Sequence, residues 1–271
     1  MAYPRLLRGR IKAYLGADLV SVVRERALWR RHAECASAHV APDDAGAQPW
    51  IPAISALGEL IAKRGWGELP IDVALSSEFV RFALVPEIKT QLSTLEMQGL
   101  AHSMFAPVLG EATADWNVRY CAVDGTTVLA SAVEKALLAA LEDLARTRRC
   151  VLRSVTPLWS CVANGQHARL ARGSVWLVLA ETRAAAFGLI EQGRWRAVRA
   201  KALDAGQGAD IARLLERESR LLGSATRDVI LVGEHGVEGF PAGWNIASAQ
   251  LVPARYGGLP AECHSAALAG T

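Results

Sequence analysis

The sequence predicts an α/β protein built from two similar lobes, each combining a mixed sheet with helices. Two observations carry this prediction. The stretch from Ser174 to Leu203 has the pattern of three consecutive antiparallel strands, and a weaker copy of the pattern begins at Ala13. Each copy is followed by a helical periodicity and then by an apolar strand. A repeated unit of this kind indicates a duplicated fold.

The first lobe is expected over residues 1–165. Its first strand runs through Ala13, and the turn at Gly16 to Asp18 precedes the return strand. In the helix expected at 94–105, Leu95, Leu100 and Met104 are the positions expected to be buried. The remaining elements are strands at 19–23, 29–40, 71–75, 79–84, 118–123, 126–130 and 151–155, and helices at 50–64 and 131–146.

The second lobe is expected over residues 166–255. Its first strand is almost entirely apolar, which is typical of a strand buried on both faces. Residues 256–271 are small and offer little to bury, so they are expected to form a flexible tail. The expected elements are strands at 175–179, 184–190 and from 195 onward, a helix at 206–223 and a strand at 228–232.

The composition excludes several classes of protein. The chain has 271 residues, of which 51% are hydrophobic and 21% charged, as in a globular protein, and its net charge of +3 does not argue for a nucleic-acid partner. Its five cysteines are odd in number and contain no C-x-x-C pair, which predicts no zinc site, no disulfide framework and a reducing compartment. No apolar run reaches the roughly 18 residues of a membrane span. A cytoplasmic protein is expected.

The order of hairpin, third strand, helix and strand, found twice, resembles the actin-like ATPase superfamily. Within it, the chain is most similar to the branch of PilM of type IV pili and the cytoplasmic domain of GspL of type II secretion. The segment from Val73 to Pro86 looks like the strand pair that leads into that branch's small inserted subdomain. The resemblance covers about residues 10–255. It implies a duplicated RNase H-like fold with the inserted subdomain at about 78–123.

Members of this superfamily hold ATP and Mg²⁺ on glycine-containing hairpin turns that carry acidic side chains. The resemblance therefore points to Asp18 and Ser21 in the first turn, Glu181 and Thr182 in the second, and Gly233 after the late strand. Glycines expected beside these positions are replaced by Leu19 and Val20 in the first turn, are absent from the second, and give way to Glu234 after Gly233. Bulky and acidic residues oppose a phosphate. We expect no catalytic residue, no metal and no bound cofactor.

The resemblance also implies a partner. It predicts a non-catalytic scaffold that docks the cytoplasmic tail of a PilN-like or GspM-like inner-membrane protein, lies at the membrane periphery through that partner, and also meets a secretion or pilus ATPase. The residues expected to contact the tail are Phe79, Arg81, Phe82, Met104 and Tyr120. Two alternatives remain open: an actin-like ATPase that uses Asp18 and Glu181, and a small-molecule kinase of the same superfamily.

Overall fold

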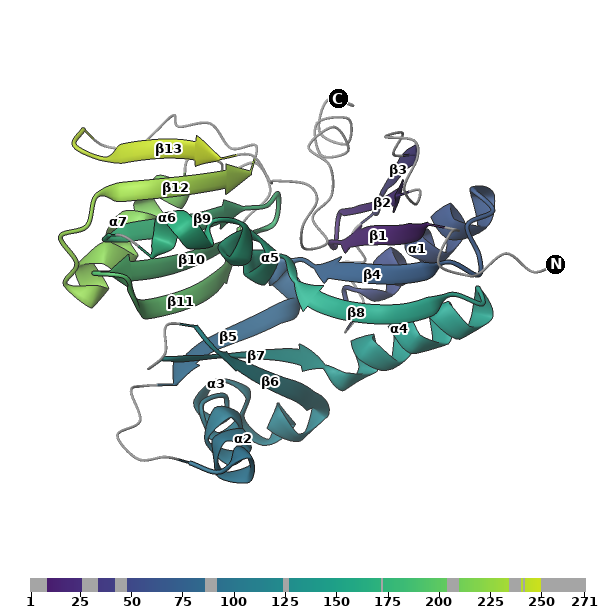
Figure 1. Cartoon of the computed structure of the whole chain (residues 1–271), viewed down its shortest axis with the longest axis horizontal. Helices are drawn as coiled ribbons and strands as arrows, with labels where there is room; N and C mark the ends of the chain where they lie inside the picture. Colours follow the sequence, from purple (N-terminus) through teal and green to yellow (C-terminus); the bar gives the residue numbers. More distant parts are fainter. Residues whose placement is uncertain are drawn as a thin grey trace. The chain divides into compact units, whose positions relative to one another are not determined.

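The computed structural model describes residues 9–25, 34–41, 48–85, 92–123, 127–171, 173–203, 210–233, 240 and 242–249. The described residues form two compact units, residues 9–79 with 136–165 and residues 80–135 with 166–249. They contain two five-stranded sheets and one three-stranded sheet (Figure 1). The expected tail at 256–271 and the eight residues at 26–33, which include the start of the expected third strand, lie outside the described residues.

The sheet of the first unit has the strand order β3-β2-β1-β4-β8. The pairs β1–β2 and β2–β3 are antiparallel, whereas β1–β4 and β4–β8 are parallel. The elements of this unit are β1 (Arg10–Leu15), β2 (Leu19–Glu25), β3 (Glu34–His39), α1 (Ile51–Lys63), β4 (Pro70–Leu75), the 3₁₀ helix η2 (Ser77–Phe79), α4 (Lys135–Thr147), β8 (Val151–Pro157) and α5 (Leu158–Gly165).

The second large sheet repeats the first. Its order is β11-β10-β9-β12-β13, with the same antiparallel and parallel pairings in the same sequence, and Figure 1 shows its five strands side by side. This correspondence confirms the predicted duplication. The elements are α6 (His167–Leu170), β9 (Val175–Ala180), β10 (Ala184–Glu191), β11 (Arg194–Ala202), α7 (Asp210–Leu222), β12 (Asp228–Gly233) and β13 (Asn245–Ala249).

The helices that cover these sheets follow their apolar spacing. In α1, a proline in the first turn fits the helix start, and Ala53, Leu57 and Ile61 are buried at intervals of four residues. In α7, Ile211 and Leu215 enter the core of the second large sheet, where they join Trp176 and Phe187. The same arrangement of third strand, helix and fourth strand therefore recurs in both large sheets.

The third sheet is the predicted insertion. It has the order β5-β7-β6, and a core that includes Phe105 and Trp116 lies between it and its helices. Ser93 begins its first helix with a capping box, in which its side chain accepts from the Glu96 N–H and the Glu96 carboxylate accepts from the Ser93 N–H. The elements are β5 (Val80–Val85), α2 (Thr94–Ser103), α3 (Ala106–Leu109), η3 (Gly110–Asp115), β6 (Trp116–Ala122) and β7 (Val128–Glu134).

Three expectations about this insertion differ from the structure. Residues 131–134 belong to strand β7 rather than to the helix expected at 131–146, because Ser131 and Val133 pair with Phe82 and Val80 of β5. The inserted sheet therefore extends to Glu134, beyond the expected limit at 123. The insertion also groups with the second large sheet rather than with the first, since β5 lies beside β11.

A buried lysine lies inside the first sheet. Lys12 of β1 is fully buried, and its Nζ lies 2.5 Å from Glu25 Oε1 of β2. Arg10 Nε donates to the other oxygen of that carboxylate at 2.7 Å. Burial raises the pKa of Glu25, but the hydrogen bonds and charges of Lys12 and Arg10 outweigh burial and hold the pKa below its ordinary value. Glu25 therefore serves as the counter-charge that allows Lys12 to be buried.

Two further observations concern cysteines and membrane spans. Cys121, Cys150 and Cys161 are free thiols, whereas Cys35 of β3 is disulfide-bonded. That bond was not predicted from the cysteine spacing. Among the described helices, none combines the length and the hydropathy needed to cross a membrane.

Candidate functional site

The turn between β1 and β2 is closed by the protein's own groups. The Gly16 N–H donates to the Leu19 carbonyl at 2.9 Å, so this amide is used within the hairpin. The side chain of Tyr14 lies beside Gly16: a Cβ at position 16 would be 2.7 Å from its hydroxyl oxygen. Tyr14 and Ala17 are both buried. A phosphate approaching this side of Gly16 would meet the tyrosine ring.

The turn between β9 and β10 repeats the first turn, bond for bond. The Glu181 N–H donates to the Ala184 carbonyl at 2.8 Å, as Gly16 donates to Leu19. The Leu203 N–H donates to the Arg183 carbonyl at 2.8 Å, and the Val40 N–H donates in the same way to the Asp18 carbonyl at 2.7 Å. Both hairpins therefore have three-residue loops, in which Gly16 corresponds to Glu181 and Asp18 corresponds to Arg183.

This correspondence changes the interpretation of the two acidic residues. Asp18 and Glu181 were expected at matching positions, but they occupy different places in their loops because Glu181 follows the last residue of β9 directly. Asp18 is half-buried, whereas Glu181 is buried. At the position that matches Asp18, the second turn has a cation, Arg183. The two turns therefore do not present carboxylates at matching positions.

The two hydroxyl residues occupy different settings, one in a strand and one in a turn. Ser21 lies within β2, opposite Tyr14 in the register, and it is fully buried. Its position is therefore in the sheet rather than in the loop. Thr182 is exposed at the tip of the second loop. Among the described residues, no cluster of three or more histidine, cysteine, aspartate or glutamate side chains is arranged to hold a metal ion.

Gly233 has a structural reason to be glycine. It ends β12, pairs with Ala180 of β9, and has a φ of 128°, which side chains rarely adopt. A Cβ at this position would lie 2.2 Å from the Ala180 carbonyl oxygen. The close approach of the two strands therefore requires glycine here without any ligand.

The expected partner-binding residues do not form one surface. Arg81 and Phe82 are neighbours on β5 and consequently point to opposite faces of the inserted sheet. The Arg81 guanidinium lies 5.6 Å from the centre of the Trp116 ring, on the face that carries α2. Met104 and Tyr120 pack on that same face, and the Tyr120 hydroxyl donates to the Thr94 carbonyl at 3.3 Å. Phe79 lies in η2 of the first unit and is buried.

Exposed apolar side chains on the inserted helices were not predicted. Leu95, which was expected to be buried, is 82% exposed on α2, and Val108 on α3 is 72% exposed. Met97 and Leu100 of α2 are partly buried, and Ala101 is fully buried. The weak apolar periodicity of α2 explains the wrong expectation, because it does not define which side of the helix faces the sheet.

The fold is shared with solved structures of low sequence similarity. No protein-family model and no curated protein sequence matches the chain. The PilM-PilN type IV pilus biogenesis complex contains a chain that is 13% identical, with a TM-score of 0.67 over 91% of this chain and 89% of that one. The cytoplasmic domain of EpsL, an inner-membrane component of the Vibrio cholerae type II secretion system, is 13% identical, with a TM-score of 0.57 over 89% and 88% of the two chains.

A third structure supports the same fold assignment. A protein of unknown function from Bacteroides thetaiotaomicron, with an actin-like ATPase fold, is 10% identical and has a TM-score of 0.61 over 88% of this chain and 87% of that one. All three likenesses extend over nearly the whole of both chains. The chain therefore has the actin-like ATPase fold, in a form similar to PilM and to the cytoplasmic domain of EpsL.

Proposed function

We propose that the chain is a non-catalytic scaffold of a type IV pilus or type II secretion-like assembly. The observation that carries this proposal is the likeness to the PilM-PilN complex over 91% of the chain. In this role the chain docks the cytoplasmic tail of a PilN-like or GspM-like inner-membrane protein. That tail would hold it on the cytoplasmic side of the membrane, where a secretion or pilus ATPase is a further partner.

The closed hairpin turns support a scaffold over an ATPase. A phosphate-binding turn needs backbone N–H groups that are free to donate and small residues that allow close approach. Here the Gly16 and Glu181 amides donate within their own hairpins, and Tyr14 fills the space beside Gly16. Binding of ATP would require these groups to rearrange at a cost in free energy.

The inserted subdomain is the proposed docking region. Its surface includes Leu95 of α2, which is exposed, half-buried Tyr120 of β6 and exposed Arg81 of β5, which provide apolar groups and a positive charge. An amphipathic or extended peptide with apolar anchors and an acidic residue would complement such a surface. Met104, at the end of α2, packs against the core of the inserted subdomain and so supports the position of this helix.

The proposal is tested with a synthetic peptide that matches the cytoplasmic tail of the PilN-like protein encoded in the same genome. Isothermal titration calorimetry should show saturable binding to the unmodified chain. Leu95→Asp should weaken that binding by about tenfold or more, because it places a carboxylate in an apolar contact. Ile51→Asp is the matched control, since Ile51 is an apolar residue that is 49% exposed on α1 of the other unit. Equal affinities for the two variants would exclude docking at α2.

A further inference from the structure

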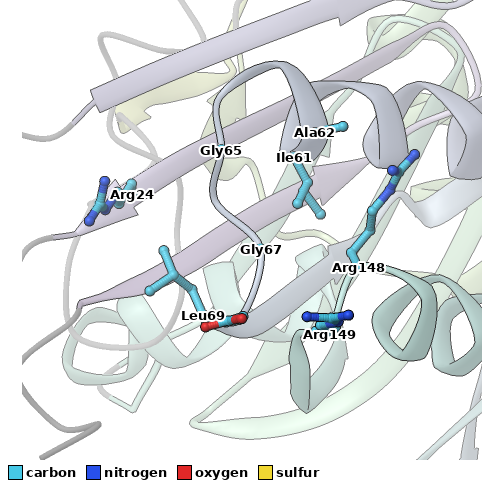
Figure 2. A pocket seen from close by; sticks show the side chains of 9 residues that line it. Arg24, Ile61, Ala62, Gly65, Gly67, Leu69, Arg148 and Arg149 are labelled. Carbon is cyan, nitrogen blue, oxygen red and sulfur yellow. The ribbon is translucent and has the colours of Figure 1, made fainter. Parts of the chain in front are cut away.

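A pocket of about 650 Å³ lies in the first unit, where the ends of α1 and α4 meet the sheet. Three arginines and a single glutamate are the charged residues that line it: Arg24, Arg148, Arg149 and Glu68. In the view of Figure 2, Arg24 lies on one side of the pocket, and Arg148 and Arg149 lie on the other. The pocket therefore has an excess of two positive charges, distributed over two walls.

The three arginines are not used in ion pairs among the described residues. The Nε atoms of Arg24 and Arg148 are buried without a hydrogen-bond partner in that part of the chain. Both side chains are half-buried as a whole, but a buried N–H group of a guanidinium is costly unless an acceptor satisfies it. An anion between the two walls would supply the missing acceptors.

Capping of the helix ends does not explain why three arginines line this pocket. The terminal carbonyls of α1 and α4 already accept backbone N–H groups: Gly65 donates to Ala62, Trp66 to Ile61, Arg149 to Arg146 and Cys150 to Ala145. The arginine side chains are consequently not needed as caps. The partial negative charge of the α4 terminus would favour Arg148 and Arg149, but Arg24 lies on β2 and follows no helix.

The walls of the pocket are held in place by the backbone. The Glu68 N–H donates to the Arg148 carbonyl at 3.3 Å, and a Cβ at Gly67 would lie 2.9 Å from that carbonyl oxygen. Glu68 and Arg149 have φ values of 65° and 57°, and they are two of the three non-glycine residues with a left-handed φ in the described chain. Buried Trp66 anchors the same loop. A site fixed in this way needs little ordering when a ligand binds.

From these observations we infer that the pocket binds a small, multiply charged oxyanion of the phosphate class. Arginine is suited to this ligand because its planar fork donates two parallel hydrogen bonds to a phosphate. The volume lies within the range of small-molecule sites. Arg24 lies six positions after Asp18, a distance of about 20 Å along an extended strand, so this pocket is separate from the hairpin turn. The phosphate group belongs either to a soluble metabolite or to a lipid headgroup.

The test uses inorganic pyrophosphate as the probe and titration calorimetry on the full chain. One molecule should bind per chain, and added salt should weaken the binding. Arg148→Gln and Arg149→Asn should each weaken binding by about tenfold, since each removes a charged hydrogen-bond donor. Asparagine tolerates the left-handed backbone at position 149, so this variant keeps the fold. Glu68→Gln should strengthen binding by about twofold or more, because it removes the one negative charge of the pocket.

Arg146→Gln is the matched control. Arg146 lies in the last turn of the same helix but is exposed and paired with Asp143, so its loss should leave pyrophosphate affinity unchanged. A second arm measures flotation with phosphatidylglycerol vesicles. Flotation that requires Arg149 and is displaced by pyrophosphate would identify a lipid headgroup as the source of the phosphate. The inference is overturned if pyrophosphate fails to bind, or if Arg146→Gln weakens it as much as Arg149→Asn.

Discussion

At the scale of single residues, three buried side chains with polar groups shape the first sheet and its turn. Lys12, Tyr14 and Ser21 all point to the same side of the first sheet, as their register requires, and all three are buried. Sequence patterns place Tyr14 next to the turn, but they do not reveal that its ring folds back over Gly16. The position of the ring depends on the direction in which the Tyr14 side chain points, and the local periodicity of the sequence does not encode that direction.

The ion pair of Lys12 and Glu25 yields a prediction on stability and pH. Glu25→Gln should lower the free energy of unfolding at pH 7 by about 3 kcal/mol, because it leaves a buried ammonium without a counter-charge. The folded-state pKa of Glu25 lies below its ordinary value of 4.5. Its stabilising contribution is therefore complete above that value and is lost as the pH falls through the lowered pKa. Urea unfolding of both proteins across this pH range measures the effect.

Two controls separate the buried pair from a general loss of charge. Glu59→Gln removes an exposed carboxylate that pairs with Lys63 on α1, and it should change stability by less than about 0.5 kcal/mol. Adding Lys12→Met to Glu25→Gln should restore part of the loss, since a methionine fills the space without a charge. Equal losses for Glu25→Gln and Glu59→Gln would contradict this account.

At the scale of elements, the sequence predicted most strands and helices but not their partners. The repeated hairpins were found because alternation and turn residues are local signals. Strand β13 was not predicted because Ile246 is its only large apolar residue, and the expected β7 was too short because the last residues of this strand also fit a helix. The mismatch of Asp18 and Glu181, which lie two positions apart in the matched loops, has the same origin, since backbone hydrogen bonds rather than composition set where each loop begins.

The close approach of β9 and β12 gives a prediction at this scale. Gly233→Ala should destabilise the protein by at least about 2 kcal/mol more than Gly243→Ala, because a Cβ at position 233 meets the Ala180 carbonyl as well as an unfavourable φ. Gly243 has a φ of 93° and open space around it, so its variant measures backbone strain alone. Thermal unfolding of the two variants provides the comparison, and similar losses would show that the strands can separate without cost.

At the scale of the whole molecule, the fold was predictable and the site was only partly so. Two lobes with one strand order appear as a repeat in the sequence, which is why the actin-like fold was recognised. The grouping of the insertion with the second lobe was not predicted. It depends on contacts between β5 and β11, which are more than a hundred residues apart in the sequence. The arginine pocket likewise combines three distant segments.

The proposed absence of ATPase activity is also tested on the whole chain. Millimolar ATP with Mg²⁺ should leave the melting temperature almost unchanged, because a ligand stabilises a folded protein only when its concentration approaches or exceeds its dissociation constant. Stabilisation that disappears in Asp18→Ala but persists in Thr182→Ala would overturn the scaffold proposal in favour of an active ATPase. Stabilisation that survives Asp18→Ala and is lost in Arg149→Asn would instead belong to the arginine pocket.

The position of Tyr14 has an evolutionary consequence. A glycine introduced at 17 or 19 would loosen the first loop, but the phenol ring would still occupy the space beside Gly16. Mutations toward phosphate affinity would therefore show no benefit until the tyrosine had been replaced. Its replacement alone would leave a cavity in the core and lower stability. In a lineage with this tyrosine, the first substitution toward phosphate binding therefore lowers stability without a gain in affinity. This cost opposes the return of a phosphate-binding loop.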